Sequence, residues 1–211
     1  MNLAANERGR FKSRGNDDVV RLVTENPLAW VFLRDTDGPF ATAAPIRPVI
    51  ADALLTGFIG HVPRGQRIAK CLEQRGTRGL ILALGPHGYI SPSWMSDRTQ
   101  APTWNFTAAQ FIAELRLVDD SSFLDSHLRD LTRALEEGRQ KPWRVDEMGT
   151  RLEKLAGRIV AFSATIIERD TRFKLGQDED DTTYREIIEA LGNDGKGELV
   201  AWMHAFNSSR R

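Results

Sequence analysis

The segment Gly60–Gln66 combines residue types that can bind an anionic group. It lies between a predicted strand and a predicted helix, where backbone N–H groups are free and the helix dipole is positive. Arg64 could add a bidentate, charge-assisted hydrogen bond to a phosphate, and His61 could act as a hydrogen-bond donor or as a metal ligand. An ordinary loop with an exposed Arg64 is the alternative that the spacing leaves open.

A second segment, Gly85–Trp94, follows an apolar predicted strand. Its two glycines and two prolines predict an irregular backbone. Tyr89 and Trp94 supply flat surfaces, each with one polar tip, that suit the face of a ring-shaped ligand. Two core aromatic residues at a barrel corner would give the same pattern.

A third segment, Ala101–Phe106, leads into the longest predicted strand. Thr103 and Asn105 could hydrogen-bond the polar edge of a ring while Trp104 packs on its face. A strand start fixed by Pro102 is the competing interpretation.

The sequence lacks the motifs of the common nucleotide-binding, hydrolase and metal sites. The chain has no P-loop motif and no GxGxxG, HExxH, CxxC or GxSxG motif. Its four histidines are scattered, which argues against a closed zinc site. The one cysteine, Cys71, excludes a disulfide within one chain, and its apolar neighbours predict a packed thiol in a reducing compartment.

The predicted elements are mostly short strands with a few attached helices, which indicates a β-barrel rather than alternating βαβ units. Alternating apolar residues predict two long strands, one from Pro102 to Val118 and one from Arg158 to Arg169. The predicted helix Ser121–Glu137 has an apolar face that ends at Leu135. The other predicted strands are 28–34, 40–46, 54–60 and 79–85, and the other predicted helices are 17–25, 67–74, 151–156, 184–191 and 198–206.

Composition limits the partners. Lysine plus arginine and aspartate plus glutamate number 29 each among 211 residues, so the molecule as a whole has no field that attracts DNA. A DNA contact would need a local basic patch, and the candidates are Arg8, Arg10, Lys12 and Arg14 near the start and Arg210 and Arg211 at the end. Terminal charge of this kind is more often a solvated tail, so DNA contact stays open but is not supported by the overall charge. The polar N-terminus is not a signal peptide, and the longest apolar runs are strand-length. We therefore expect a cytoplasmic protein that does not enter a membrane.

Together the three segments resemble the PaiB family, often described as FMN-binding negative transcriptional regulators. The family's GHxxRAN, GPxAYISPSWY, PTWNY and KLSQN segments match, in this order, Gly60–Gln66, Gly85–Met95, Pro102–Phe106 and Lys174–Asp178. The resemblance runs from about Val19 to Leu191. Four positions depart from the family pattern, namely Gln66, Met95, Gly176 and Asp178.

The resemblance implies a mainly β (α+β) fold, an FMN-binding split β-barrel with peripheral helices, assembled as a homodimer with the flavin between subunits. It implies a polar tail over residues 1–16, the split-barrel domain with inserted and C-terminal helices over 17–192, and a C-terminal helix and tail over 193–211. The implied cofactor-binding residues are His61, Arg64, Gln66, Tyr89, Ser91, Thr103, Trp104, Asn105, Lys174 and Gln177. Six of them, from separate segments, are expected to converge around one pocket, namely His61, Arg64, Trp104, Asn105, Lys174 and Gln177.

Several functions stay open at this point. The resemblance implies an FMN-binding transcriptional regulator or flavin-dependent sensor. The sequence displays no helix-turn-helix motif, so regulation would be indirect or would use an unusual surface. Some relatives bind haem b instead, including haem-dependent cyclases that form N–N bonds in piperazate biosynthesis, and in those the histidine matching His61 looks like the iron ligand. The alternatives are therefore a haem- or flavin-dependent enzyme, such as a piperazate synthase-like cyclase or a flavin reductase-like oxidoreductase, and a cofactor-free barrel kept for dimerisation.

Overall fold

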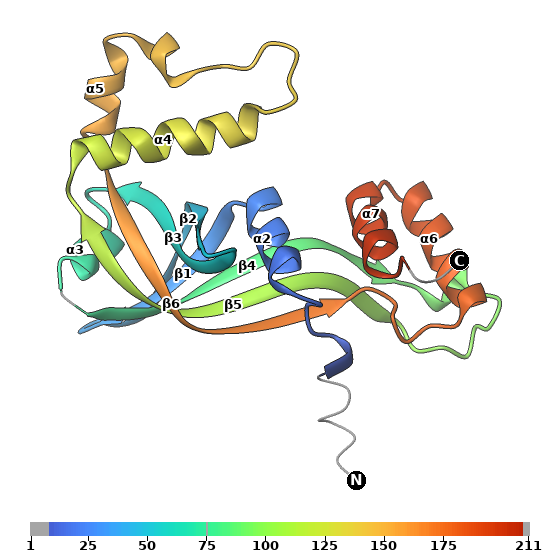
Figure 1. Ribbon diagram of the computed structural model, residues 1–211. Coiled ribbons are helices and arrows are strands. Elements are labelled where there is room, and N and C mark those ends of the chain that lie inside the picture. The colour runs from blue at the N-terminus through green and yellow to red at the C-terminus, as the bar shows by residue number, and fades with distance from the viewer. Residues whose placement is uncertain (1–8, 75, 209–211) are drawn as a thin grey trace. The chain divides into compact units, whose positions relative to one another are not determined.

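The computed structural model describes residues 9–74 and 76–208. Its strands, in chain order, are β1 (Leu28–Asp35), β2 (Gly38–Ala51), β3 (Leu54–Pro63), β4 (Thr77–Ile90), β5 (Thr103–Val118) and β6 (Ile159–Lys174). The α-helices are α2 (Asn16–Glu25), α3 (Arg67–Leu72), α4 (Ser121–Glu136), α5 (Arg151–Ala156), α6 (Asp181–Asn193) and α7 (Gly197–Phe206), and the 3-10 helices are η1 (Pro92–Trp94) and η2 (Val145–Met148) (Figure 1). Part of the predicted N-terminal tail, residues 1–8, and the last residues of the predicted C-terminal tail, 209–211, lie outside the described residues.

The strands form a closed barrel in the order β1-β2-β3-β6-β5-β4. Antiparallel pairs join β1 to β2 and to β4, and β3 to β2 and to β6. Closure removes the unpaired strand edges that would otherwise invite association through the backbone. The predicted β-barrel with attached helices is confirmed.

The chain divides into two compact units. The first comprises the described residues 9–22, 84–109 and 170–208, and the second comprises 23–74, 76–83 and 110–169. Strands β4, β5 and β6 each contribute residues to both units.

The second unit holds the barrel core. Phe58 and Phe111 meet edge to face with ring centroids 4.8 Å apart, and both side chains are buried. Strands β3 and β6 approach closely at Gly60, where a Cβ atom would lie 2.4 Å from the Phe162 ring. Helix α4 contacts β2, β3 and α5 in this unit, and Figure 1 shows it outside the barrel strands.

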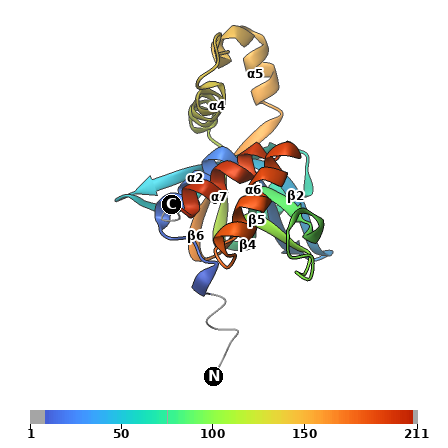
Figure 2. The same cartoon turned by 90° about the vertical axis from the view of Figure 1, so that its right-hand side faces the viewer.

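The first unit is built around Phe173 at the end of β6. Its ring lies 5.8 Å from Trp202 and 5.9 Å from Phe206, both on α7. Helices α6 and α7 contact each other and lie side by side (Figure 2). Strand β4 passes under this pair at Gly88, where a Cβ atom would lie 3.0 Å from Leu199.

Three sequence expectations need correction. The irregular backbone expected over Gly85–Trp94 is wrong for its first part, because β4 continues to Ile90 with Gly85 and Gly88 both buried, whereas Pro92–Trp94 leave the strand and form η1. Gly88 therefore allows close packing against Leu199 rather than a break in the strand. Leu135, expected on the buried face of α4, is exposed. The second long strand, expected to end at Arg169, continues to Lys174. Cys71, by contrast, is buried as predicted.

No helix within residues 9–74 and 76–208 is long and apolar enough to cross a membrane.

Candidate functional site

An aromatic group lies on the outer surface of the first unit. Trp104 on β5 is 52% exposed and Tyr89 on β4 is 46% exposed, and their ring centroids lie 6.0 Å apart in an edge-to-face arrangement. His87, two residues before Tyr89 and therefore on the same face of β4, lies 6.2 Å from Trp104 at a shallow angle of 33°. Large aromatic residues this exposed offer flat contact area for a planar ligand.

Asn105 faces the opposite way from Trp104, as successive residues of a strand must. Its side chain is buried, and its amide nitrogen approaches the Met203 sulfur at 3.7 Å. Within the part of the chain that the structure describes, the Asn105 Oδ1 atom and the Oγ1 atom of Thr107, two residues further along the same face, are buried without hydrogen-bond partners. A buried acceptor of this kind needs a donor from water or from a ligand.

Lys174 and Thr103 are brought together as a polar pair. The Lys174 ammonium donates to Thr103 Oγ1 at 2.6 Å, and it also lies 6.0 Å from the Phe11 ring centroid. This holds one positive charge beside the start of β5. A flavin phosphate or ring carbonyl is a suitable acceptor for such a group.

The side chains of Gln177 and Ser91 form hydrogen bonds with backbone groups of nearby residues in the sequence. Gln177 accepts a hydrogen bond from the Leu175 amide at 2.6 Å and donates to the Phe173 carbonyl, across the turn at Gly176 whose φ is 77°. Ser91 caps η1 by accepting from the Ser93 amide at 3.2 Å. Both side chains therefore stabilise the local backbone, whatever else they contact.

His61 in the second unit forms a pair with another histidine. His61 Nδ1 on β3 lies 3.0 Å from His127 Nε2 on α4. His127 is buried, and burial lowers its pKa to about 4, helped by the positive charge of Arg47 and by the repulsion that a protonated His61 would exert. Burial also lowers the pKa of His61. Both rings are therefore neutral at physiological pH.

Arg64 occupies the predicted junction between β3 and α3. Its Nη2 atom pairs with Asp119 Oδ1 at 2.9 Å, and this bond lowers the pKa of the Asp119 carboxyl. Gln66 sits at the N-cap of α3, with its side chain exposed and making no cap hydrogen bond. Arg64 also lines a cavity of about 450 Å³ whose walls are largely apolar, including Leu124 and Leu128 of α4.

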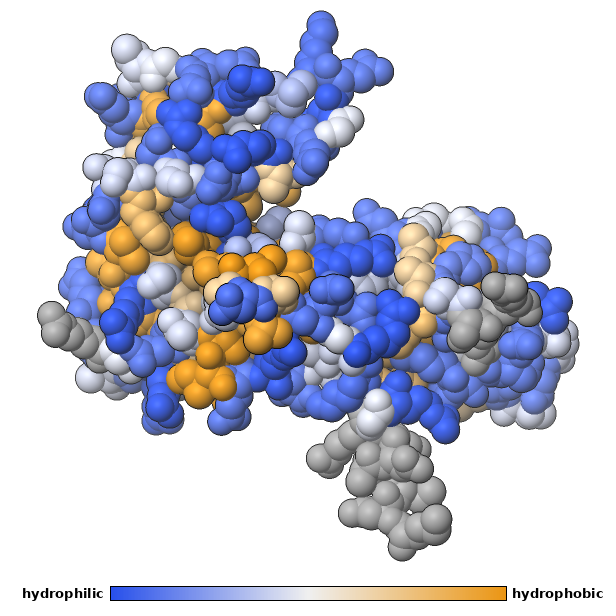
Figure 3. Space-filling model, viewed as in Figure 1, coloured by the Kyte–Doolittle hydropathy of each residue, from blue (hydrophilic) through white to orange (hydrophobic). Residues whose placement is uncertain are grey.

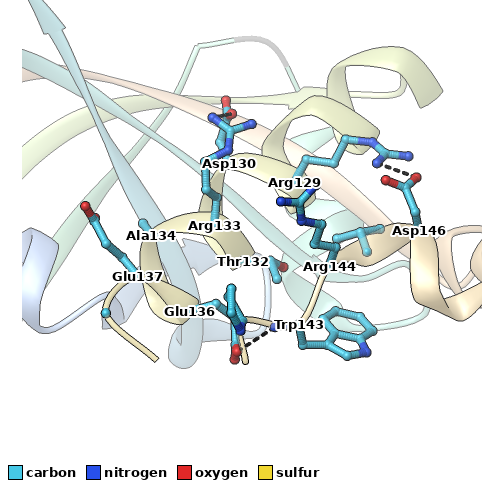
Figure 4. Close-up of a pocket in the computed structure, with 13 residues that line it drawn as sticks. Arg129, Asp130, Thr132, Arg133, Ala134, Glu136, Glu137, Trp143, Arg144 and Asp146 are labelled. Atoms are coloured by element: carbon cyan, nitrogen blue, oxygen red, sulfur yellow. Dashed lines mark hydrogen bonds and ion pairs between the residues drawn. The ribbon is translucent and has the colours of Figure 1, made fainter. Parts of the chain in front are cut away.

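A larger pocket of about 700 Å³ lies between the end of α4 and the segment that follows it. Figure 4 shows that charged side chains of this pocket already have partners: Arg129 donates to Asp146, and Glu136 accepts from the backbone amide of Trp143. None of the cofactor-binding residues expected from the sequence lines this pocket. We therefore do not assign it to the cofactor.

The structure thus groups the expected site residues within each unit. Tyr89 joins Trp104, and Lys174 joins Thr103, while Arg64 and His61 find partners that the sequence did not suggest. Their convergence on one pocket stays a prediction. His87 was missed although it stands two residues from Tyr89, a spacing that puts both on one strand face.

Comparison with known proteins places this arrangement in a family. Residues 7–168, more than half of the chain, match the family model described as "Putative FMN-binding domain". The chain belongs to this FMN-binding family. It is also 28% identical over 189 residues to the Bacillus subtilis (strain 168) protein named "Protease synthase and sporulation protein PAI 2", covering 87% of each chain, and this confirms the PaiB resemblance.

A second relative resembles the chain in sequence, and two solved structures resemble it in fold. A protein from Emericella nidulans is 26% identical over 226 residues, covering 86% of this chain and 88% of that protein. The FAD and heme binding protein from Mycobacterium smegmatis has a TM-score of 0.60 at 18% identity, covering 85% of this chain and 79% of that one. The flavocytochrome Anf3 from Azotobacter vinelandii has a TM-score of 0.58 at 18% identity, covering 83% and 75%. At these identities the two structures establish the fold, which is the expected split barrel.

Proposed function

We propose that this chain is a homodimeric FMN-binding protein with a sensing or regulatory role. The observation that carries the proposal is the exposed aromatic group of Trp104, Tyr89 and His87, in a chain that belongs to an FMN-binding family. The isoalloxazine ring of a flavin is planar and apolar on its faces, and it is recognised by flat contacts plus a few polar groups at its edge.

Polar groups of the first unit suit the same cofactor. The Lys174 ammonium can donate to a phosphate or a ring carbonyl, and Thr103 holds it in place. The unpartnered Asn105 Oδ1 atom can accept from a ring N–H, although Asn105 and Trp104 lie on opposite faces of β5. One flavin ring would therefore use either the Trp104 side or the Asn105 side of this strand, and we assign it to the Trp104 side.

A row of apolar side chains on β1 supports the homodimer. Leu28, Trp30 and Phe32 alternate with buried residues and are all exposed. Across the strands Trp30 pairs with Ala43 of β2 and Leu82 of β4, so the apolar surface continues sideways. Figure 3 shows apolar side chains gathered over the barrel. Exposed contiguous apolar surface in a globular protein usually marks an interface.

The regulatory part of the proposal is supported by the relative in Bacillus subtilis, whose name refers to protease synthesis and sporulation. The equal numbers of acidic and basic residues give no general attraction to DNA, so we expect a regulatory effect to pass through the flavin or a protein partner. Random duplex DNA should not be retarded at physiological salt. Tight, salt-sensitive retardation would contradict this part of the proposal.

Binding of FMN is tested by titrating the purified chain and following quenching of flavin fluorescence. Trp104→Ala should weaken FMN binding roughly 10- to 100-fold, since stacking of a planar base on an aromatic side chain is worth about 1–3 kcal/mol. Trp143→Ala is the matched control, because Trp143 is also 40% exposed but lies in the pocket that we do not assign to the cofactor. Equal FMN affinity in the wild type and Trp104→Ala would refute the assigned ring surface.

A further inference from the structure

The histidine pair joins β3 to α4 by a single hydrogen bond. His61 Nδ1 and His127 Nε2 are 3.0 Å apart, and the two ring centroids are 5.2 Å apart at 62°. A bond between two imidazole nitrogens requires one N–H and one lone pair. With both rings neutral, each ring carries one proton, so only two arrangements of the protons are available.

In one arrangement, His61 donates from Nδ1 and His127 accepts at Nε2. His127 then carries its own proton on Nδ1, and His61 presents a bare Nε2 lone pair to its surroundings. In the other arrangement, His127 donates from Nε2 and His61 accepts at Nδ1. His127 Nδ1 is then a lone pair, and His61 presents an Nε2–H donor.

The surroundings of His127 Nδ1 decide between them. This atom is buried, and no hydrogen-bond partner for it exists among residues 9–74 and 76–208. An N–H at that position would be an orphaned buried donor, which folded proteins avoid more strictly than an unpaired acceptor. Besides the neutral His61 ring, the groups that act electrostatically on His127 are Arg47 and Asp130. Arg47 has donors only, and Asp130 is paired with Arg47 at 3.4 Å and with Arg133 at 3.3 Å.

We infer that His127 is a positioning residue that donates its Nε2–H to His61 Nδ1 and thereby fixes His61 as an Nε2–H donor. In this state His61 can donate to an acceptor oxygen, such as that of a phosphate or a ring carbonyl. It does not present the lone pair that a haem iron requires. The inference deepens the proposed function, on which its FMN part rests, because an Nε2–H donor suits the acceptor oxygens of a flavin and does not suit a haem iron.

The polarity of the pair is the reverse of that in metal sites. A histidine that binds a metal usually donates its second ring N–H to an acceptor, which leaves the lone pair of the other nitrogen facing the metal. Here the second nitrogen of His61 accepts. Haem ligation would require both protons to move, which would leave His127 with an unpaired buried N–H.

The decisive measurement is the proton position on His61 in the wild-type chain. Long-range proton–nitrogen NMR correlations of protein labelled with ¹⁵N-histidine, recorded above pH 7, distinguish the two tautomers, and the His61→Gln spectrum identifies the His61 signals. We expect a proton on His61 Nε2. A proton on His61 Nδ1 would overturn the inference, and this test needs no variant at position 127.

Two variants separate positioning from packing. His127→Gln can keep an amide N–H near the place of Nε2, whereas His127→Phe keeps a ring without a donor. We expect His127→Gln to retain the Nε2–H tautomer of His61 and His127→Phe to give a mixture of both tautomers. His127→Phe should also bind haem b at least about tenfold more tightly than the wild type, since the orphaned donor that opposes iron ligation is gone. An unchanged His61 tautomer in folded His127→Phe would overturn the assigned role.

Failure of this inference and failure of the proposed function are distinguishable. FMN binding together with a proton on His61 Nδ1 would leave the proposed function intact and refute the inference. Absence of FMN binding together with a proton on His61 Nε2 would refute the proposed function and leave the assignment of the tautomer standing.

Discussion

Replacing Trp30 on β1 should separate the proposed dimer into monomers. A tryptophan side chain can bury about 250 Å², and the exposed 51% of Trp30 therefore offers about 125 Å² to a partner. At about 25 cal/mol per Å², full burial of that surface is worth about 3 kcal/mol per subunit. A twofold-symmetric interface uses each residue twice, so the upper bound for Trp30→Ser is about 6 kcal/mol per dimer.

Half of that bound is a realistic loss, because interface residues are seldom fully desolvated. We therefore expect the dimer Kd to rise roughly 100-fold, which corresponds to about 3 kcal/mol. Sedimentation velocity over a series of protein concentrations measures the Kd directly. Far-UV circular dichroism and the Tm should stay close to those of the wild type, since Trp30 faces outward.

The control is Leu135→Ser, which removes an apolar side chain that is 49% exposed but lies on α4 instead of β1. It should leave the dimer Kd unchanged. A monomeric wild-type chain at micromolar concentration would refute the dimer itself. Equal weakening by Trp30→Ser and Leu135→Ser would show that the β1 row is not the interface.

Three further expectations concern single residues. Arg64→Ala should weaken FMN binding, measured by fluorescence titration, by about 2–3 kcal/mol, the scale for losing a charged hydrogen-bond partner. The unfolding free energy, measured in urea, should fall by up to about 3 kcal/mol as the pH drops from about 6.5 to about 4. The reason is that the pKa of His127 is about 4 in the folded chain, whereas the histidine of the unfolded chain binds its proton near pH 6.5. Gly60→Ala should cost about 1–3 kcal/mol of unfolding free energy because its Cβ atom would lie 2.4 Å from the Phe162 ring, while Gly65→Ala, with nothing within 4 Å, should not destabilise the chain.

Each of these has an outcome that contradicts it. Unchanged FMN affinity in Arg64→Ala would remove Arg64 from the cofactor site. The stability that depends on neutral His127 is fully present above pH 6.5 and lost below pH 4, so an equally steep pH dependence in His127→Gln would point to other groups. Equal effects of the two glycine substitutions would show that the approach of β3 to β6 at Gly60 is not tight.

The sequence predicted the barrel well because strands are local patterns. Leu28–Arg34 alternates buried and exposed residues in β1, and the Asp35–Gly38 turn joins it to β2 in register. It misjudged Gly85–Ile90 because glycine and proline mark turns only on average. In β4 the glycines instead make room for neighbouring side chains, as Gly88 does beneath Leu199. That requirement comes from tertiary packing and is invisible in the local sequence.

The residues of the candidate site also fall into those that the local sequence predicts and those that depend on tertiary structure. Tyr89 and Trp104 could be assigned from residue type, and the structure brings their rings together. Gln177 was assigned by family resemblance, and the hydrogen bonds described for it run to the backbone of Phe173 and Leu175. A motif residue can therefore be retained for the turn it stabilises, and resemblance alone does not distinguish that role from a cofactor contact.

His127 shows which information the sequence withheld. It lies in the buried stripe of α4 between Leu124 and Leu131, at helical spacings of three and four residues, where a leucine is the ordinary occupant. A buried histidine costs free energy unless its ring finds a partner, and the only partner described for it is His61, 66 residues away in the sequence. The tautomers of His61 and His127 cannot be assigned independently. In the proposed arrangement the single ring proton of His127 is on Nε2, where it is donated to His61, and Nδ1 carries none. The choice between an oxygen acceptor and an iron at His61 thus depends on a helix that carries none of the family's motifs.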